Sequence, residues 1–178
     1  MKLPLTLVVI GALIIASPSV AEVRETQQNG FTIETTVMAD ASPAAVYRKL
    51  VKVAGWWDHA HTWSGSAGNL RLWPEAGGCF CEKLAHNGSV EHARVIFAQP
   101  GKMLRLEGAL GPLQDMAVSA VLTFSLAPDG SGTRIKMTYR VAGSLTMDPA
   151  KLAPLVDQVM ATQLGRLRSF AGGAPPGH

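Results

Sequence analysis

The sequence predicts an α+β fold in which an antiparallel sheet of about seven strands is covered by one long C-terminal helix. Three observations lead to this prediction. Residues 31–39 alternate as a strand does and are followed by a helix start. Six further runs with strand character between residues 70 and 141 are separated by turn residues. Residues 147–170 have the apolar spacing of a long amphipathic helix.

Residues 1–21 are typical of a secretory signal peptide and are excluded from the predicted fold. Lys2 precedes an apolar run from Leu5 to Ala16, and Pro18 and the small residues Ser19 and Ala21 follow. The alternative is a membrane anchor, but a membrane-spanning helix needs ~20 apolar residues. We therefore expect cleavage after Ala21, an exported, periplasmic protein, and no membrane span once the signal is removed.

The remaining chain predicts one domain, residues 22–171, with a flexible tail at 172–178. Its charges are interspersed, and the formal net charge of the whole chain is only +3. No block of lysines and arginines and no basic stripe with aromatic residues occurs, which argues against a nucleic acid partner.

The first strand and helix follow from alternation and from capping. Ser42 and Pro43 predict a helix start, because serine is a favoured N-cap and proline fits the first helical position. Gly55 is the expected stop. The predicted inward side of the strand comprises Phe31, Ile33, Thr35 and Val37.

The other strands are bounded by turn signals, and these also predict the register. If Asn87-Gly88 forms a two-residue hairpin, Glu82 faces Ala93, and if Pro100-Gly101 forms the next turn, Phe97 faces Leu104. The predicted strands are 70–73, 79–85, 89–98, 102–108, 117–127 and 133–141. The predicted core face of the middle strands carries Phe80, Glu82, Leu84, Glu91, Ala93, Val95, Phe97, Leu104 and Leu106, and the other face carries Cys79, Cys81, Lys83, His92, Arg94, Met103, Arg105 and Glu107.

The terminal helix is predicted to begin after Asp148, a plausible N-cap that Pro149 follows. Pro154 leaves an alternative start near Ala153. The predicted apolar stripe consists of Leu152, Leu155, Val156, Val159, Met160, Gln163, Leu164, Leu167 and Phe170.

This order of elements resembles the helix-grip fold of the START-like (SRPBCC) superfamily, which includes plant pollen allergens, polyketide cyclases and activators of a heat-shock chaperone ATPase. The resemblance spans residues 31–170 and is firmest at 41–47, 77–82, 132–135 and the terminal helix. It points to an exported bacterial branch without a settled activity. It implies a cleft between sheet and helix and leaves function open, since the superfamily hosts binders, transporters and a few enzymes.

Two features of the middle strands leave alternatives open. Glu82, a carboxylate among apolar neighbours, must be paired, protonated or lining a polar part of a cavity. Cys79 and Cys81 are either two small residues packed on the outer face, the favoured interpretation, or partners in a strained disulfide. Zinc is not expected at this pair, because no second cysteine pair exists.

Three tryptophans lie in the aperiodic segment 56–68, which should close one end of the cleft. They form either a gate around a ligand or a plug that fills the space. The predicted ligand-binding residues are Trp56, Trp57, Trp63, Phe80, Glu82, Val95, Leu106, Tyr139 and Met160.

A metal site and a catalytic site are supported by fewer residues than a ligand-binding site is. Asp58, His59 and His61 contain ligand types but lack a ligand spacing, so we predict no metal and no cofactor. A catalytic role would use Glu82 with His61 as an acid–base pair.

We predict an exported protein that encloses an apolar or amphipathic small molecule between sheet and helix, with a cyclase- or hydrolase-type enzyme or a protein-interaction module as alternatives. The oligomeric state stays open.

Overall fold

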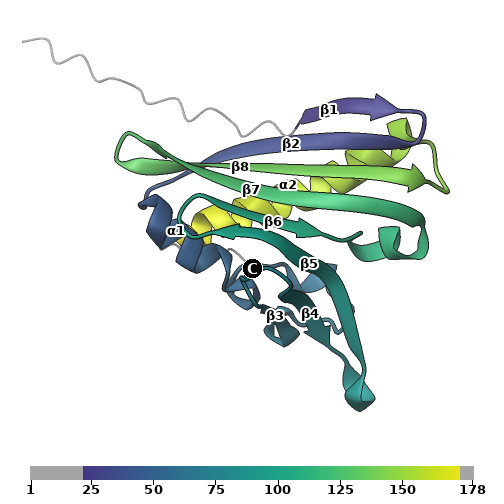
Figure 1. The fold of residues 1–178 in the computed structure, drawn as a ribbon, viewed down its shortest axis with the longest axis horizontal. Coiled ribbons are helices and arrows are strands. Elements are labelled where there is room, and N and C mark those ends of the chain that lie inside the picture. The colour runs from purple at the N-terminus through teal and green to yellow at the C-terminus, as the bar shows by residue number, and fades with distance from the viewer. Residues whose placement is uncertain (1–21, 173–178) are drawn as a thin grey trace, which may run out of the picture.

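One antiparallel sheet of eight strands organises the computed structural model, which describes residues 22–172 (Figure 1). The strand order is β1-β2-β8-β7-β6-β5-β4-β3. The strands are β1 Glu22–Gln27, β2 Gly30–Ala39, β3 Leu70–Leu72, β4 Cys79–Lys83, β5 Ser89–Gln99, β6 Met103–Glu107, β7 Ala117–Asp129 and β8 Gly132–Ser144. The helices are α1 Pro43–Leu50 and α2 Pro149–Ala171. Short 3₁₀ turns lie between α1 and β3 (η1 Val53–Gly55, η2 His59–His61 and η3 Ala67–Asn69), between β4 and β5 (η4 Ala85–Asn87) and between β6 and β7 (η5 Gly111–Asp115).

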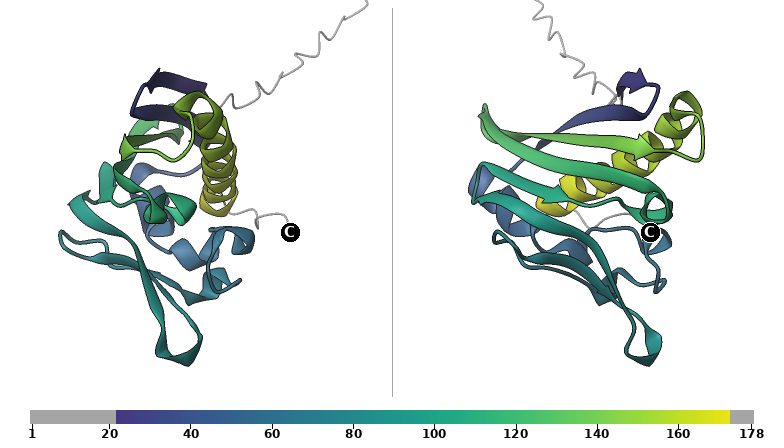
Figure 2. Two further views of the ribbon diagram at one scale, coloured as in Figure 1. Left: turned by 90° about the vertical axis from the view of Figure 1, so that its right-hand side faces the viewer. Right: turned by 45° about the vertical axis from the view of Figure 1, so that its right-hand side comes forward.

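The sheet curves around α2, and this is the helix-grip arrangement that the sequence predicts (Figure 2). α2 makes most of its sheet contacts with β2 and β1, so the β3–β6 side is covered by other segments. Those segments are the chain between α1 and β3 and the turn η5, and they enclose a space together with α2.

Both predicted helix starts are confirmed. The Ser42 side chain accepts a hydrogen bond from the amide of Ala45, and Asp148 accepts one from that of Ala150. α2 begins at Pro149 and runs through Pro154, so the alternative start near Ala153 is wrong.

The prediction of about seven strands misses β1. Its sequence alternates charged and polar residues around Val23, without the apolar side that identifies a half-buried strand. Within residues 22–172, β1 is an edge strand whose one partner is β2, and charged side chains are common on such edges because they discourage further pairing.

The inner face of β2 is as predicted, and β7 and β8 alternate in the same way. Phe31, Ile33, Thr35 and Val37 are buried on β2. So are four residues of β7 and four of β8: Ala120, Leu122, Phe124, Leu126, Ile135, Met137, Tyr139 and Val141. These long strands pair without a register shift, so the period of two holds along their whole length.

The predicted β4–β5 hairpin is wrong in its turn and in its register. The loop contains the turn η4, where His86 and Asn87 both have positive φ, and it is longer than two residues. Glu82 therefore faces Val90 rather than Ala93. A bulge places His92 as an extra residue between the partners of Phe80 and Cys81, so His92 turns inward and Glu91 turns outward.

A second bulge reverses the predicted position of Phe97. Val95 pairs with Leu106 and Phe97 pairs with Arg105, so Ile96 is the extra residue. Phe97 lies on the outer face with 42% of its surface exposed, and the Arg105 guanidinium lies 5.9 Å from the centre of its ring. The prediction that Phe97 faces Leu104 in the core is wrong, because one extra residue moves each following side chain to the other face.

Cys79 and Cys81 lie on the outer face, as predicted, and are joined in a disulfide. Their Cα atoms are 5.4 Å apart, which is within the range for bridged cysteines. The favoured interpretation as two unbridged small residues is therefore wrong.

Among residues 22–172, no helix combines the length and the hydropathy needed to cross a bilayer. The predicted signal peptide lies outside the described residues, and so does the predicted tail apart from Gly172.

Candidate ligand-binding site

A cavity of about 450 Å³ lies between α2, the inner face of the sheet and two loops. Apolar side chains dominate its wall. The lining residues are Trp57, Ala60, His61, Thr62, Trp63, His92, Leu110, Gly111, Pro112, Leu113, Met116, Tyr139, Leu152, Leu155, Val156, Val159 and Met160.

The loop around η2 forms one wall and is fastened to α2. Gln163 of α2 is buried, and its Oε1 accepts the amide N–H of Asp58 at 2.9 Å. The Nε2 of Gln163 lies 2.9 Å from Nδ1 of His61. Since the amide oxygen already accepts a bond, Nε2 is the donor, and His61 Nδ1 is the acceptor.

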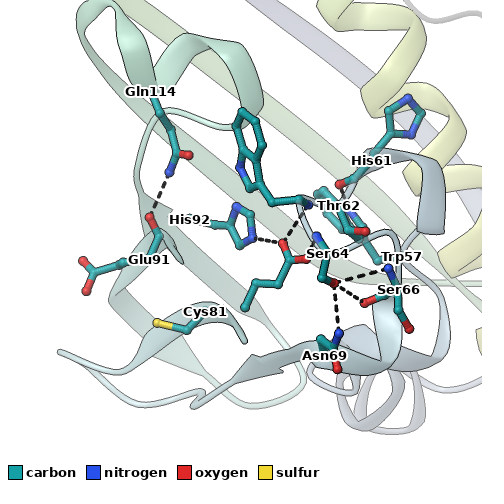
Figure 3. Close-up of polar contacts among 12 residues, drawn as sticks. Trp57, His61, Thr62, Ser64, Ser66, Asn69, Cys81, Glu91, His92 and Gln114 are labelled. Atoms are coloured by element: carbon teal, nitrogen blue, oxygen red, sulfur yellow. Dashed lines mark hydrogen bonds and ion pairs between the residues drawn. The ribbon is translucent and has the colours of Figure 1, made fainter. Parts of the chain in front are cut away.

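The same loop is fastened to the sheet by Glu82 of β4. Its carboxylate accepts the backbone N–H groups of Trp63 at 3.1 Å and of Ser64 at 2.6 Å. A third contact joins it to Nε2 of His92 at 2.9 Å (Figure 3). Only 1% of Glu82 is exposed, and it does not line the cavity, so of the three alternatives for this carboxylate the paired one is correct.

Burial opposes the ionisation of Glu82, but the hydrogen bonds from Ser64, Trp63 and His92 outweigh it and lower the pKa of the carboxyl. Burial also lowers the pKa of His92, and the contact with Glu82 only partly offsets this effect. The pair is therefore a carboxylate and a neutral imidazole near pH 7.

His92 is the polar wall residue that the sequence prediction missed, because it was assigned to the outer face. It is 6% exposed, lines the cavity, and its ring centre lies 5.0 Å from that of Phe80. One signal was present in the sequence: a buried carboxylate needs a partner, and His92 lies in the neighbouring strand, two residues beyond the one that pairs with Glu82.

The tryptophans divide into wall and core. Trp57 and the half-exposed Trp63 line the cavity, and the Trp57 indole donates to the carbonyl of His61 at 2.9 Å. Trp56 is a core residue that donates to the Leu50 carbonyl and lies edge-on to Phe124. The indoles do not fill the space, so the interpretation as a plug is wrong.

The other predicted ligand-binding residues divide in the same way. Tyr139 and Met160 line the cavity, whereas Phe80, Val95 and Leu106 pack in the core outside it. The Tyr139 hydroxyl accepts the amide N–H of Leu110 and donates to the carbonyl of Gly108, and its burial raises the pKa of the phenol strongly.

The segment from Leu110 to Met116 supplies a wall that sequence reasoning did not assign. Gly111-Pro112 predicts a turn, and the turn η5 is what forms there. Its apolar residues have no regular period, so only the tertiary structure shows that Leu113 and Met116 face the cavity.

The residues considered for metal binding are engaged separately. Asp58 accepts the amide N–H of Ala60, His59 Nδ1 accepts that of Ala67, and His61 contacts Gln163. The pairing of Glu82 with His61 considered for catalysis does not form, because Glu82 contacts His92 instead.

No family model matches the chain, and no curated protein matches it. Solved structures with the same architecture do. An uncharacterized Rhizobium leguminosarum protein is 19% identical, with a TM-score of 0.59 over 87% of this chain and 98% of its own. CalU16 from Micromonospora echinospora is 15% identical, with a TM-score of 0.54 over 90% of this chain and 86% of its own.

A third structure is DynU16, a protein of the dynemicin biosynthetic locus. It is 14% identical, with a TM-score of 0.57 over 82% of this chain, which matches 48% of DynU16. These proteins share the fold. At such identities the likeness carries no site residue from one chain to the other.

Proposed function

We propose that this protein binds an apolar or amphipathic small molecule in the cavity between the sheet and α2. The cavity itself is the observation that carries the proposal. Its volume of about 450 Å³ lies within the range of small-molecule sites. Mostly apolar walls with a few fixed polar groups are also typical of such sites.

The walls support binding because hydrogen bonds within the protein hold them in place. Gln163 fastens the η2 loop to α2, Glu82 fastens it to β4, and Tyr139 fastens the chain before η5 to β8. A pre-formed cavity costs less ordering on binding than a loop that must fold around its ligand.

The test is a thermal-shift and tryptophan-fluorescence screen with fatty alcohols, sterols and polycyclic aromatics. A ligand at 100 times its Kd should stabilise the protein by about 2.7 kcal/mol. It should also change the emission of Trp57 and Trp63, which line the cavity. No response from any compound in the panel would contradict the proposal.

A variant that fills the cavity gives the matched control. Val159→Trp places an indole on the face of α2 that lines the cavity, and Thr162→Trp places one on an exposed position of the same helix. We expect Val159→Trp to abolish binding and Thr162→Trp to leave it unchanged. Unchanged binding in Val159→Trp would show that the ligand binds elsewhere, and equal loss in both variants would show that the effect is not specific to the cavity.

We further propose that binding takes place outside the cytoplasm, as the predicted signal peptide implies. The disulfide between Cys79 and Cys81 supports this, because disulfides persist in oxidising compartments. N-terminal sequencing of the protein from its own host should begin at Glu22. A chain that still begins at Met1 would contradict the proposal.

Acid–base catalysis on the bound molecule is a second candidate function. The contact between Glu82 and His92 favours it, since a carboxylate that orients an imidazole is a common arrangement for a general base. A ligand found in the screen should then change mass when it is incubated with the protein, and His92→Gln should stop the change while binding persists. If the mass of the ligand stays unchanged, catalysis is contradicted and binding remains as the proposed function.

A further inference from the structure

One ring nitrogen of His92 is hydrogen-bonded to another side chain of the protein. Its Nε2 lies 2.9 Å from the carboxylate of Glu82, and the Phe80 ring lies beside it. The ring forms part of the cavity wall. Its Nδ1 makes no hydrogen bond to any residue between 22 and 172.

The partners of Glu82 fix which nitrogen carries the proton. The carboxylate already accepts two backbone N–H groups, from Trp63 and Ser64. A carboxylate in that position can only accept from His92, so Nε2 is the protonated nitrogen. Because the neutral imidazole has one proton on its two nitrogens, Nδ1 carries a lone pair and is a hydrogen-bond acceptor.

Among the other polar groups of the wall, both hydroxyls and Nδ1 of His61 are engaged, whereas Nε2 of His61 and the indole N–H of Trp63 make no hydrogen bond within residues 22–172. The Tyr139 hydroxyl bonds to Gly108 and Leu110, and the Thr62 hydroxyl donates to the carbonyl of His59. His61 Nδ1 is occupied by Gln163. Nδ1 of His92 is thus an acceptor without a partner on a ring that lines the cavity.

We propose that the natural ligand is a hydroxyl-bearing apolar molecule, such as a phenol, whose hydroxyl donates to Nδ1 of His92. The inference rests on the proposed function and deepens it by naming the polar group of the ligand. Glu82 acts as a positioning residue that holds the imidazole as an acceptor. A ligand with an ionised carboxylate would offer no proton and would bring a second negative charge close to Glu82, so fatty acid anions are disfavoured.

The test compares 4-hydroxybiphenyl with biphenyl and 4-methoxybiphenyl, three probes that share one apolar body, by isothermal titration calorimetry. We expect the hydroxyl compound to bind the wild-type protein about tenfold more tightly than the methoxy compound. In His92→Phe, which keeps an apolar ring, this preference should fall to within about twofold while biphenyl still binds. Leu155→Ala, at an exposed position of the cavity wall, should weaken all three probes by a similar factor.

A measurement on the wild-type protein keeps the inference testable if His92→Phe fails to fold. Long-range ¹H–¹⁵N spectra of the histidines should show the Nε2–H tautomer for His92. The Nδ1 resonance should move on addition of 4-hydroxybiphenyl and not on addition of biphenyl.

Two outcomes would overturn the inference and leave the proposed function standing. They are equal affinity for all three probes and the Nδ1–H tautomer of His92. If none of the three probes binds but a compound of the panel does, the inference fails alone; if the panel is silent as well, the proposed function fails with it.

Discussion

Glu82 holds together the part of the molecule formed by β4, β5 and the loop before η3. Its three hydrogen bonds join these segments. A buried carboxylate is unfavourable unless each oxygen is satisfied, and here both oxygens accept. The residue that the sequence marked as a possible ligand contact is therefore a structural link that also orients His92.

Glu82→Ala should be strongly destabilising. It leaves the N–H groups of Trp63 and Ser64 and the Nε2 of His92 without an acceptor, so we expect a loss of about 3–5 kcal/mol in urea unfolding. The control is Glu91→Ala, which removes an exposed ion pair with Arg94 and should cost under about 1 kcal/mol. Similar losses in both variants would contradict the role of Glu82.

Stability should fall as the pH falls below neutral. The pKa of His92 is lowered by folding from its ordinary 6.5, so the unfolded chain binds the proton first and stability drops as the pH decreases through that value. The pKa of Glu82 is lowered from 4.5, so a second loss follows at lower pH. In His92→Phe the loss near pH 6 should shrink, which urea unfolding at pH 7.5 and 5.5 would show. A slope equal to that of the wild type would contradict this assignment.

At the scale of elements, α2 both covers the sheet and holds the cavity wall. Its stripe is interrupted by Gln163, a polar residue that is fully buried. The Gln163 side-chain amide is satisfied there, because it forms hydrogen bonds with both Asp58 and His61. The sequence places Gln163 on the inner stripe, and only the fold shows that its partners lie in a loop about a hundred residues earlier.

Gln163→Leu should loosen the η2 loop. The amide of Asp58 and Nδ1 of His61 lose their partner, so hydrogen exchange in this loop should accelerate and stability should fall by about 1–3 kcal/mol. Gln158→Leu, at an exposed position of the same helix, should change neither quantity measurably. Unchanged exchange in Gln163→Leu would show that other contacts hold the loop.

At the scale of the whole molecule, the cavity exists because α2 covers only part of a curved sheet. α2 packs on the β1–β2 side, and loops cover the rest. The disulfide lies on the opposite, outer face and takes no part in the wall. Ligand binding should therefore be independent of its redox state.

Reduction of the disulfide should have a small effect. It closes a very short loop, because its cysteines are two residues apart, so its entropic contribution is at most about 1.5 kcal/mol. The double variant Cys79→Ser with Cys81→Ser should bind the probes as the wild type does. A large loss of binding would show that the outer face is coupled to the cavity.

The sequence by itself determined seven of the eight strands, the N-caps of both helices and the inner face of β2. These follow from local periodicity and from capping, which depend on neighbouring residues. Only the tertiary structure decided which residues of β5 face inward, because two bulges arise from pairing with other strands. It likewise decided that Glu82 meets His92 rather than His61, and that the tryptophans leave a cavity, since contacts between distant segments settle both.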